Sequence, residues 1–288
     1  MSHEIELKLA LGPQGPEALR RHPRLAGLAP RLATLGNTYF DTPEGALATA
    51  RMALRLRRAD GRLLQTLKTR GQGGGGLSRR GEWEWEVPGP GLDLAGLAAL
   101  PPMAGHGDAL LARLVPRFAT DFRRETWRLE LGEARIELAL DLGEIRAADR
   151  TVAIRELELE LEAGEPEALW DLAEALAESV PLRPADTSKA ARGGALLAGT
   201  WTLPEGGGAD AWLHRAVVAL DALADTGEPR WREQARDAFL HLADPAGSLH
   251  AAARELAQGL DDPAWPTPAF GLAALRLARR LPGDGQLS

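Results

Sequence analysis

Alternation of charged and apolar residues with a period of two constrains the fold of this chain more than any other feature. In the segment 156–161, for example, Glu156, Glu158 and Glu160 alternate with leucines. Successive side chains of a β-strand point to opposite faces, so this pattern predicts strands. Asp60-Gly61 predicts a two-residue hairpin turn. Eight strands are expected in the first 200 residues, over 3–9, 34–41, 50–58, 62–69, 77–87, 117–131, 134–141 and 151–161.

Several of these strands carry charges of one sign on their polar face. Glu156, Glu158 and Glu160 are all acidic, whereas Arg55 and Arg57 are both basic. Like charges side by side on a sheet repel each other, which disfavours the alternative of an open sheet with a solvated charged face. The segregation is explained if the charged faces line a cavity with an acidic wall and a basic wall, and helices cover the apolar faces. The sequence therefore predicts a mainly β protein built on a closed eight-stranded antiparallel β-barrel with a polar tunnel and flanking helices.

The flanking helices are expected at 15–28 and 165–179. After Trp201 the sequence pattern changes from mostly strand-like to helical. The run LPEGGG at 203–208 predicts a linker. Beyond it, apolar residues recur at helical spacing and prolines separate the stretches. We expect a tunnel domain over 1–202 and a small helical appendage over 209–288, with helices at 209–225, 229–243, 246–260 and 268–281.

Composition narrows the class of protein. The chain has 34 basic and 41 acidic residues and a net charge of -7, which argues against a nucleic-acid binder held by bulk positive charge. There is no cysteine, so disulfides, thiolate metal sites and cysteine nucleophiles are excluded. Apolar runs fall short of the ~20 residues that a membrane helix needs, and the charged N-terminus is unlike a signal peptide. We therefore expect a cytoplasmic protein that binds neither membrane nor nucleic acid.

The residue types of the charged faces indicate a ligand. Oxygen donors without cysteine favour a hard cation such as Mg²⁺ or Mn²⁺. Converging arginines and lysines favour a ligand with many anionic oxygens, such as a polyphosphate. All but three of the 34 basic residues are arginines, and the exceptions are Lys8, Lys68 and Lys189. A lysine offers a compact ammonium ion rather than a planar fork, which suggests a specific need at these three positions.

A set of ordered motifs resembles one known family. HEIELKL at 3–9 resembles the ExExK signature of the CYTH superfamily, also called triphosphate tunnel metalloenzymes. All three lysines fall on family positions, and the bacterial inorganic triphosphatases are the most similar branch. The likeness extends over about residues 1–200 through NTYFDTP (37–43), MALRLRR (52–58), LLQTLKT (63–69), SRRGEWEWEV (78–87), FATDFRRETWRLEL (118–131), IELALDLGEI (136–145), RELELELEAG (155–164) and TSKAARG (187–193).

The resemblance implies metal-dependent hydrolysis of a triphosphate, with inorganic tripolyphosphate cleaved to diphosphate and phosphate. The residues implied in catalysis are Glu4, Glu6, Lys8 and Glu158. The metal ligands implied are Glu4, Glu6, Asp141, Glu156 and Glu158, with Glu160 as a further one. The phosphate chain would be bound by Lys8, Arg55, Arg57, Lys68, Arg124 and Lys189, with Arg80 as a further contact. Glu82, Glu84 and Glu137 share the same face, and strand parity favours Arg124 over its neighbour Arg123.

Alternatives of the same fold are a thiamine triphosphatase, an adenylate cyclase and an RNA 5′-triphosphatase. A further alternative is a non-catalytic polyphosphate-binding module. Many family members continue into a long, histidine-containing CHAD domain, but the tail here is short and its histidines (His214, His241 and His250) are scattered. We expect a reduced or unrelated bundle that could mediate self-association or bind a protein partner.

Overall fold

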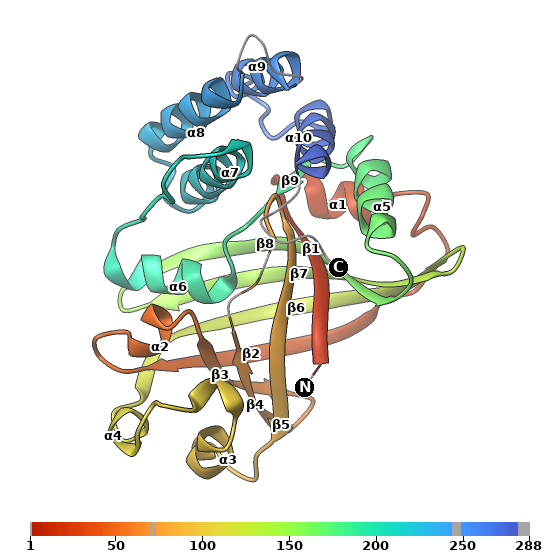
Figure 1. Cartoon of the computed structure of the whole chain (residues 1–288). Helices are drawn as coiled ribbons and strands as arrows, with labels where there is room; N and C mark the ends of the chain where they lie inside the picture. Colours follow the sequence, from red (N-terminus) through yellow and green to blue (C-terminus); the bar gives the residue numbers. More distant parts are fainter. Residues whose placement is uncertain (1, 70, 72, 244–248, 282–288) are drawn as a thin grey trace.

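The computed structural model describes residues 2–69, 71, 73–243 and 249–281, and its strands dominate the first two thirds of the chain (Figure 1). The strands are β1 (Ser2–Leu11), β2 (Arg31–Asp41), β3 (Ala53–Ala59), β4 (Arg62–Lys68), β5 (Leu77–Glu86), β6 (Val115–Leu131), β7 (Ala134–Ala147), β8 (Arg150–Ala163) and β9 (Leu182–Pro184). The helices that accompany them are α1 (Gly15–Arg20), α2 (Ala46–Thr49), α3 (Leu94–Ala98), a 3-10 turn (Pro101–Met103), α4 (Asp108–Leu111), α5 (Glu167–Ala177) and α6 (Lys189–Ala198).

Eight of the strands close into an antiparallel barrel, as the alternation predicted. The order is β5-β4-β3-β2-β6-β7-β8-β1, and β5 pairs with β1 to complete the ring. The short strand β9, which sequence reasoning missed, extends the sheet beside Leu9–Leu11 of β1, beyond the part of β1 that pairs with β5. Three residues are too few to show a period, so this strand had no sequence signal.

Local signals set most element boundaries. Asp60 and Gly61 both have positive φ, at 50° and 78°, as a two-residue turn of mirror-image type requires between β3 and β4. The helix expected over 15–28 ends at Arg20, because Pro23 follows closely and disfavours helical backbone at the residue before it. The strand expected over 134–141 continues to Ala147 as β7.

The apolar faces of the strands point out of the barrel and are covered by helices. Leu9, Leu138 and Leu159 are fully buried in one cluster with Leu172 and Leu176 of α5. This arrangement confirms the prediction that the charged faces point inward, since a strand that buries one face against helices presents the other to the lumen.

Four helices form the C-terminal part, close to the predicted ranges: α7 (Ala209–Thr226), α8 (Pro229–Leu242), α9 (His250–Gly259) and α10 (Pro268–Arg280). Residues 244–248 and 282–288 of the predicted tail lie outside the described residues. The helices share a core with the barrel, because Leu220 of α7 and Leu275 of α10 belong to the same apolar cluster as Leu7 of β1. No described helix combines the length and apolar character that a membrane crossing requires.

Helix α2 ends in a turn with an unusual residue. The N–H of Arg51 donates to the carbonyl of Ala48, and the N–H of Met52 donates to that of Leu47, which is the Schellman pattern. Arg51 occupies the position that normally holds glycine and has a φ of 57°. An L-residue in this left-handed conformation costs roughly 1–2 kcal/mol relative to its relaxed backbone.

We therefore expect Arg51→Gly to raise the free energy of unfolding by about 1 kcal/mol, because glycine adopts this backbone without steric cost. Urea denaturation measures the change. Arg51→Ala is the control, since it removes the same side chain but keeps the unfavourable φ, and it should give no such gain. Equal stability of the two variants would contradict the prediction.

Candidate active site

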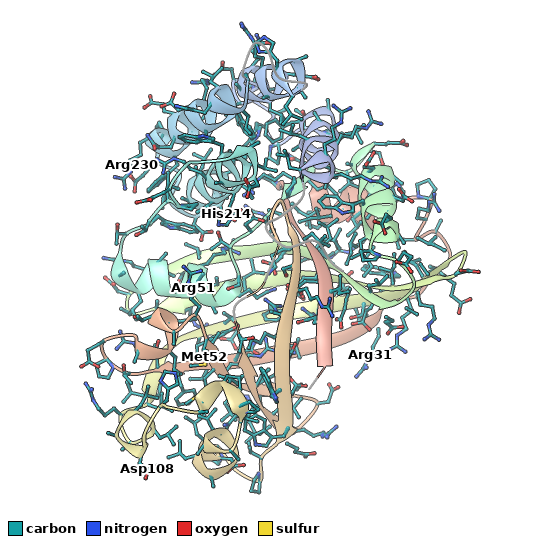
Figure 2. The ribbon with its side chains drawn as sticks, viewed as in Figure 1. Arg31, Arg51, Met52, Asp108, His214 and Arg230 are labelled. Carbon is teal, nitrogen blue, oxygen red and sulfur yellow. The ribbon has the colours of Figure 1, made fainter. Side chains whose placement is uncertain are left out.

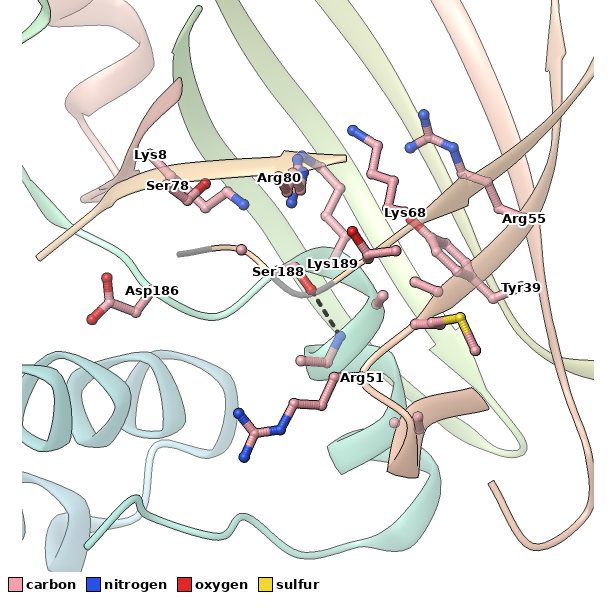
Figure 3. A pocket seen from close by; sticks show the side chains of 18 of the residues that line it. Lys8, Tyr39, Arg51, Arg55, Lys68, Ser78, Arg80, Asp186, Ser188 and Lys189 are labelled. Atoms are coloured by element: carbon pink, nitrogen blue, oxygen red, sulfur yellow. Dashed lines mark hydrogen bonds between the residues drawn. The ribbon is translucent and has the colours of Figure 1, made fainter. Parts of the chain in front are cut away.

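The charged side chains of the barrel converge on one cavity of about 1300 Å³. Figure 3 shows Lys8, Arg55, Lys68, Arg80 and Lys189 around the same space. Most of the predicted site residues line it, namely Glu4, Lys8, Arg55, Arg57, Lys68, Arg80, Arg124, Glu158, Glu160 and Lys189. The remaining three, Glu6, Asp141 and Glu156, are buried in the surrounding wall. The fold thus brings together residues from positions 4 to 189 of the chain.

Strand register places opposite charges beside each other. Glu4 lies opposite Arg80 where β1 meets β5, and Lys68 lies opposite Glu82 where β4 meets β5. Arg124 faces Asp141 across β6 and β7. The expected division into an acidic and a basic wall holds in part. Glu6, Glu160 and Glu137 lie opposite one another across β1, β8 and β7, whereas at the positions above neighbouring strands set opposite charges side by side, which reduces repulsion.

Lys189 lies at the centre of one group, the Lys189 cluster, which also contains Asp141, Glu156, Glu158 and Arg124. The Lys189 ammonium is 2.7 Å from Asp141 and 3.0 Å from Glu158, and it also contacts Glu156. Arg124 forms two hydrogen bonds of 2.7 Å to Asp141 and one of 2.5 Å to Glu158. The three carboxylates have oxygens within 4.8 Å of one another, as a metal site would need, but each is already paired with Lys189, and two of them also with Arg124.

Burial and charge oppose each other in this cluster. Burial acts to raise the pKa of Glu158, but Lys189 and Arg124 hold it well below its usual range. For Glu156, burial prevails over Lys189 and Lys8, and its pKa is raised. The Lys189 pKa is raised by Asp141 and Glu156 although burial opposes this, so the ammonium stays charged.

A second group of ion pairs lies around Glu4. Its carboxylate is 3.1 Å from both the Lys68 ammonium and the Arg80 guanidinium. Arg80 also reaches Glu6 at 2.8 Å, and the Lys8 ammonium lies 3.5 Å from Glu6. These pairs bind the acidic part of β1 to cations from β4 and β5.

Of the predicted site residues that line the cavity, two form no ion pair with a described residue, Glu160 and Arg57. Burial, together with Glu4 and Glu137, raises the pKa of Glu160 to about 7, and no ion pair offsets this. Burial and the nearby cations Arg55 and Arg124 lower the pKa of Arg57 to about 10. The cavity therefore has an excess of negative charge at Glu160 and of positive charge at Arg57, so it suits a cation and an anion together.

The structure adds residues in or behind the cavity wall that sequence reasoning did not assign to the site. Asn37 accepts a hydrogen bond of 2.9 Å from Arg57 and donates one of 3.0 Å to Thr120, which fixes the guanidinium. Arg51 and His214 line the cavity between the barrel and the C-terminal helices (Figure 2). Asn37 stands within the NTYFDTP motif on the inward face, so strand parity could have identified it. Nothing local marks Arg51 or His214.

Strand parity separated Arg124 from Arg123 correctly. Arg124 lines the cavity, whereas Arg123 is half exposed and pairs at 2.6 Å with Glu125 on the outer face. Arg20 of α1 holds the same carboxylate at 2.7 Å.

Comparison with known proteins places this architecture in a family. A family model described as the CYTH domain matches residues 2–193. The chain belongs to the CYTH family. This confirms the resemblance drawn from the motifs, and it covers the whole barrel and the start of α6.

Two individual proteins extend the comparison. The chain is 37% identical over 199 residues to the inorganic triphosphatase of Haemophilus influenzae, covering 67% of this chain and 54% of that protein. The chain thus spans about half the length of this curated relative. A solved structure from Hippeastrum, described as a putative adenylyl cyclase with a dominant triphosphatase activity, has a TM-score of 0.52 and 24% identity. It covers 69% of this chain and 97% of its own. At this identity the likeness concerns the fold alone.

We expect Lys189→Met to lower the free energy of unfolding by about 3–5 kcal/mol, because it leaves buried carboxylates without their shared cation. Urea denaturation without added metal measures this. Adding Glu156→Gln to the variant removes one of the unpaired charges and should recover part of the loss. A single variant as stable as the wild type would contradict the neutralising role of Lys189.

Proposed function

We propose that this chain is a metal-dependent hydrolase that cleaves inorganic tripolyphosphate to diphosphate and phosphate. The observation that carries the proposal is the pair of unmatched charges in one cavity, Arg57 and Glu160. A triphosphate chain held with a divalent cation supplies both missing partners. The name of the Haemophilus influenzae relative supports the choice of inorganic substrate.

The carboxylates fit a hard divalent cation, since all are oxygen donors. We propose that Glu4, Glu6 and Glu160, with Glu158, hold Mg²⁺ or Mn²⁺, because Glu4 and Glu6 contribute to the repulsion around Glu160 that such an ion would relieve. Asp141, Glu156 and Glu158 are paired with Lys189, so these three would act as ligands only if Lys189 left them. When bound, a divalent ion would neutralise negative charge on the phosphate oxygens.

The cations provide the anion-binding part of the proposed mechanism. Arg57 is already oriented by Asn37 and keeps its charge for the ligand. Arg55 donates a hydrogen bond of 3.3 Å to Thr66 and lies 3.7 Å from Glu82 and Glu84. Lys8, Lys68, Arg80, Arg124 and Lys189 would exchange carboxylate contacts for phosphate contacts. An arginine guanidinium can donate hydrogen bonds to two phosphate oxygens at once, whereas a lysine ammonium acts as a single point charge.

In the proposed reaction, water attacks the terminal phosphorus in line with the bridging oxygen. The new P–O bond forms as the bond to the bridging oxygen breaks, and diphosphate leaves with that electron pair. A lumen carboxylate orients the water and accepts its proton. The arginines and lysines stabilise the charge that develops on the leaving oxygen. The catalytic set proposed is Glu4, Glu6, Lys8 and Glu158.

A panel of substrates tests this function. We expect the purified chain with Mg²⁺ or Mn²⁺ to release phosphate from tripolyphosphate faster than from ATP or thiamine triphosphate. Phosphate release is measured by a colorimetric assay with and without chelator. Preference for ATP or thiamine triphosphate would favour an enzyme of the same fold with another substrate. Tight tripolyphosphate binding without turnover across several metals would favour a binding module.

Removal of one carboxylate tests the metal assignment. We expect Glu4→Gln to lower kcat for tripolyphosphate by at least about 10²-fold at saturating Mg²⁺, because transition-state charge loses its compensation. Glu86→Gln is the matched control, since Glu86 lies at the exposed end of β5 and pairs with Arg62 outside the cavity. Near-native turnover by Glu4→Gln would refute the assignment.

Glu160 provides a test that does not depend on turnover. We expect Glu160→Gln to raise the melting temperature of the metal-free protein by about 2–4 °C, because the substitution removes repulsion from Glu4 and Glu137. Added Mg²⁺ should then raise the melting temperature less than it does in the wild type. An undiminished response to Mg²⁺ would exclude Glu160 as a ligand.

A further inference from the structure

Helix α7 lies beyond the family-matched residues 2–193, yet two buried ion pairs join it to the segment that carries Lys189. Arg183 of β9 lies 2.7 Å from Asp221 of α7, and these side chains are 2% and 4% exposed. Arg192, one turn after Lys189 in α6, forms hydrogen bonds of 2.5 and 3.0 Å to Asp225 of α7. The two pairs flank Lys189 on both sides along the chain.

Asp221 also fixes the backbone turn that leads into α6. Its second carboxylate oxygen accepts hydrogen bonds from the N–H groups of Asp186 and Thr187, at 3.2 and 2.9 Å. Helix α6 begins two residues later, with Lys189 as its first residue. A carboxylate from the C-terminal helices therefore holds the backbone just before the residue that carries the Lys189 side chain.

The turn at 185–188 is also connected by hydrogen bonds to the backbone of Lys8, a second lysine of the site. The Asp186 carboxylate accepts a hydrogen bond of 2.6 Å from the N–H of Gly76, and the Gly76 carbonyl accepts one of 2.9 Å from the N–H of Lys8. The N–H of Ala185 donates to the Lys8 carbonyl at 3.0 Å. A Cβ at Gly76 would lie 2.7 Å from the Lys8 carbonyl oxygen, so glycine allows this close approach. Both backbone groups of Lys8 are thus held.

Stability alone gives little reason for two acidic side chains at these buried positions of α7. A buried ion pair is often no more stabilising than apolar side chains of similar volume, because desolvation offsets the attraction. What the pairs provide is a defined geometry between α7, the turn 185–188 and α6. The contacts that define this geometry lead from α7 to two of the three lysines of the chain, Lys8 and Lys189.

We propose that Asp221 and Asp225 are positioning residues of the candidate active site. They set the place of the Lys189 ammonium and of the Lys8 backbone, so the C-terminal helices complete a site that residues 2–193 do not complete by themselves. This inference rests on the proposed function for its kinetic test, because the positioned groups are those assigned to phosphate binding.

The test uses the full chain with Asp221→Asn and Asp225→Asn, each of nearly unchanged size. We expect kcat/KM for tripolyphosphate to fall by about 10–100-fold, mainly through a higher KM, because misplaced cations bind the phosphate chain less well. Asp225→Glu keeps the charge and should recover part of the loss. The dissociation constant of tripolyphosphate, measured by calorimetry, should rise in parallel.

Leu256→Ala is the matched control, since Leu256 is buried in α9, whose main packing partners are α8 and α10 rather than α7. It should lower the melting temperature but leave KM unchanged at temperatures where it is folded. Unchanged KM and dissociation constant in both asparagine variants would overturn the proposal. If they do not fold, Arg192→Met with Asp225→Leu removes the pair without an unpaired charge, and it should fold but show the higher dissociation constant.

The two hypotheses fail separately in this experiment. A wild-type chain that releases no phosphate from tripolyphosphate defeats the proposed function, and the calorimetric constants still decide the positioning role. An active wild type whose variants match it in KM and dissociation constant defeats only the positioning role.

Discussion

Charge compensation inside a closed barrel is the constraint on which the rest of this structure depends. An ionised side chain in an enclosed lumen loses hydration, so it is stable only with a partner of opposite sign. The barrel supplies these partners from other strands, as Arg124 does for Asp141 and Arg80 for Glu4. Compensation is incomplete at Arg57 and Glu160, and these are the positions where we propose that a bound anion and cation supply the missing charge.

The Lys189 cluster connects stability with ligand binding. One ammonium ion holds three carboxylates, and Arg124 holds two of the same three. These contacts offset much of the negative charge of the three carboxylates. The same cations are the groups proposed to bind phosphate, so ligand binding would exchange one set of partners for another rather than create charge contacts from solvated groups. Because the cations are already held in the lumen, the site needs less rearrangement when a phosphate chain binds.

The C-terminal helices are joined to the barrel by both apolar and polar contacts. Leu275 of α10 and Leu220 of α7 share a core with β1, and Asp221 of α7 reaches the turn before α6. The boundary that a linker at 203–208 suggested in the sequence stays a prediction, but packing across it is continuous. Through these contacts the short helical tail is connected to residues of the candidate site.

The sequence by itself determined the strands, the face that each presents inward and the turn at Asp60-Gly61, because side-chain alternation and turn chemistry are local properties. It also identified the charged residues that the barrel strands direct into the lumen, such as Glu4, Lys68 and Arg124, since their parity follows from the same period, but not Arg51, which lies outside the strands. Only the tertiary structure decided which charges meet. Register sets Lys8 opposite Glu158, and long-range packing brings Asp221 to the segment of Lys189. In the sequence of α7, Asp221 cannot be told from an ordinary polar residue, because no local pattern indicates its ion-pair partner Arg183, which lies 38 residues away.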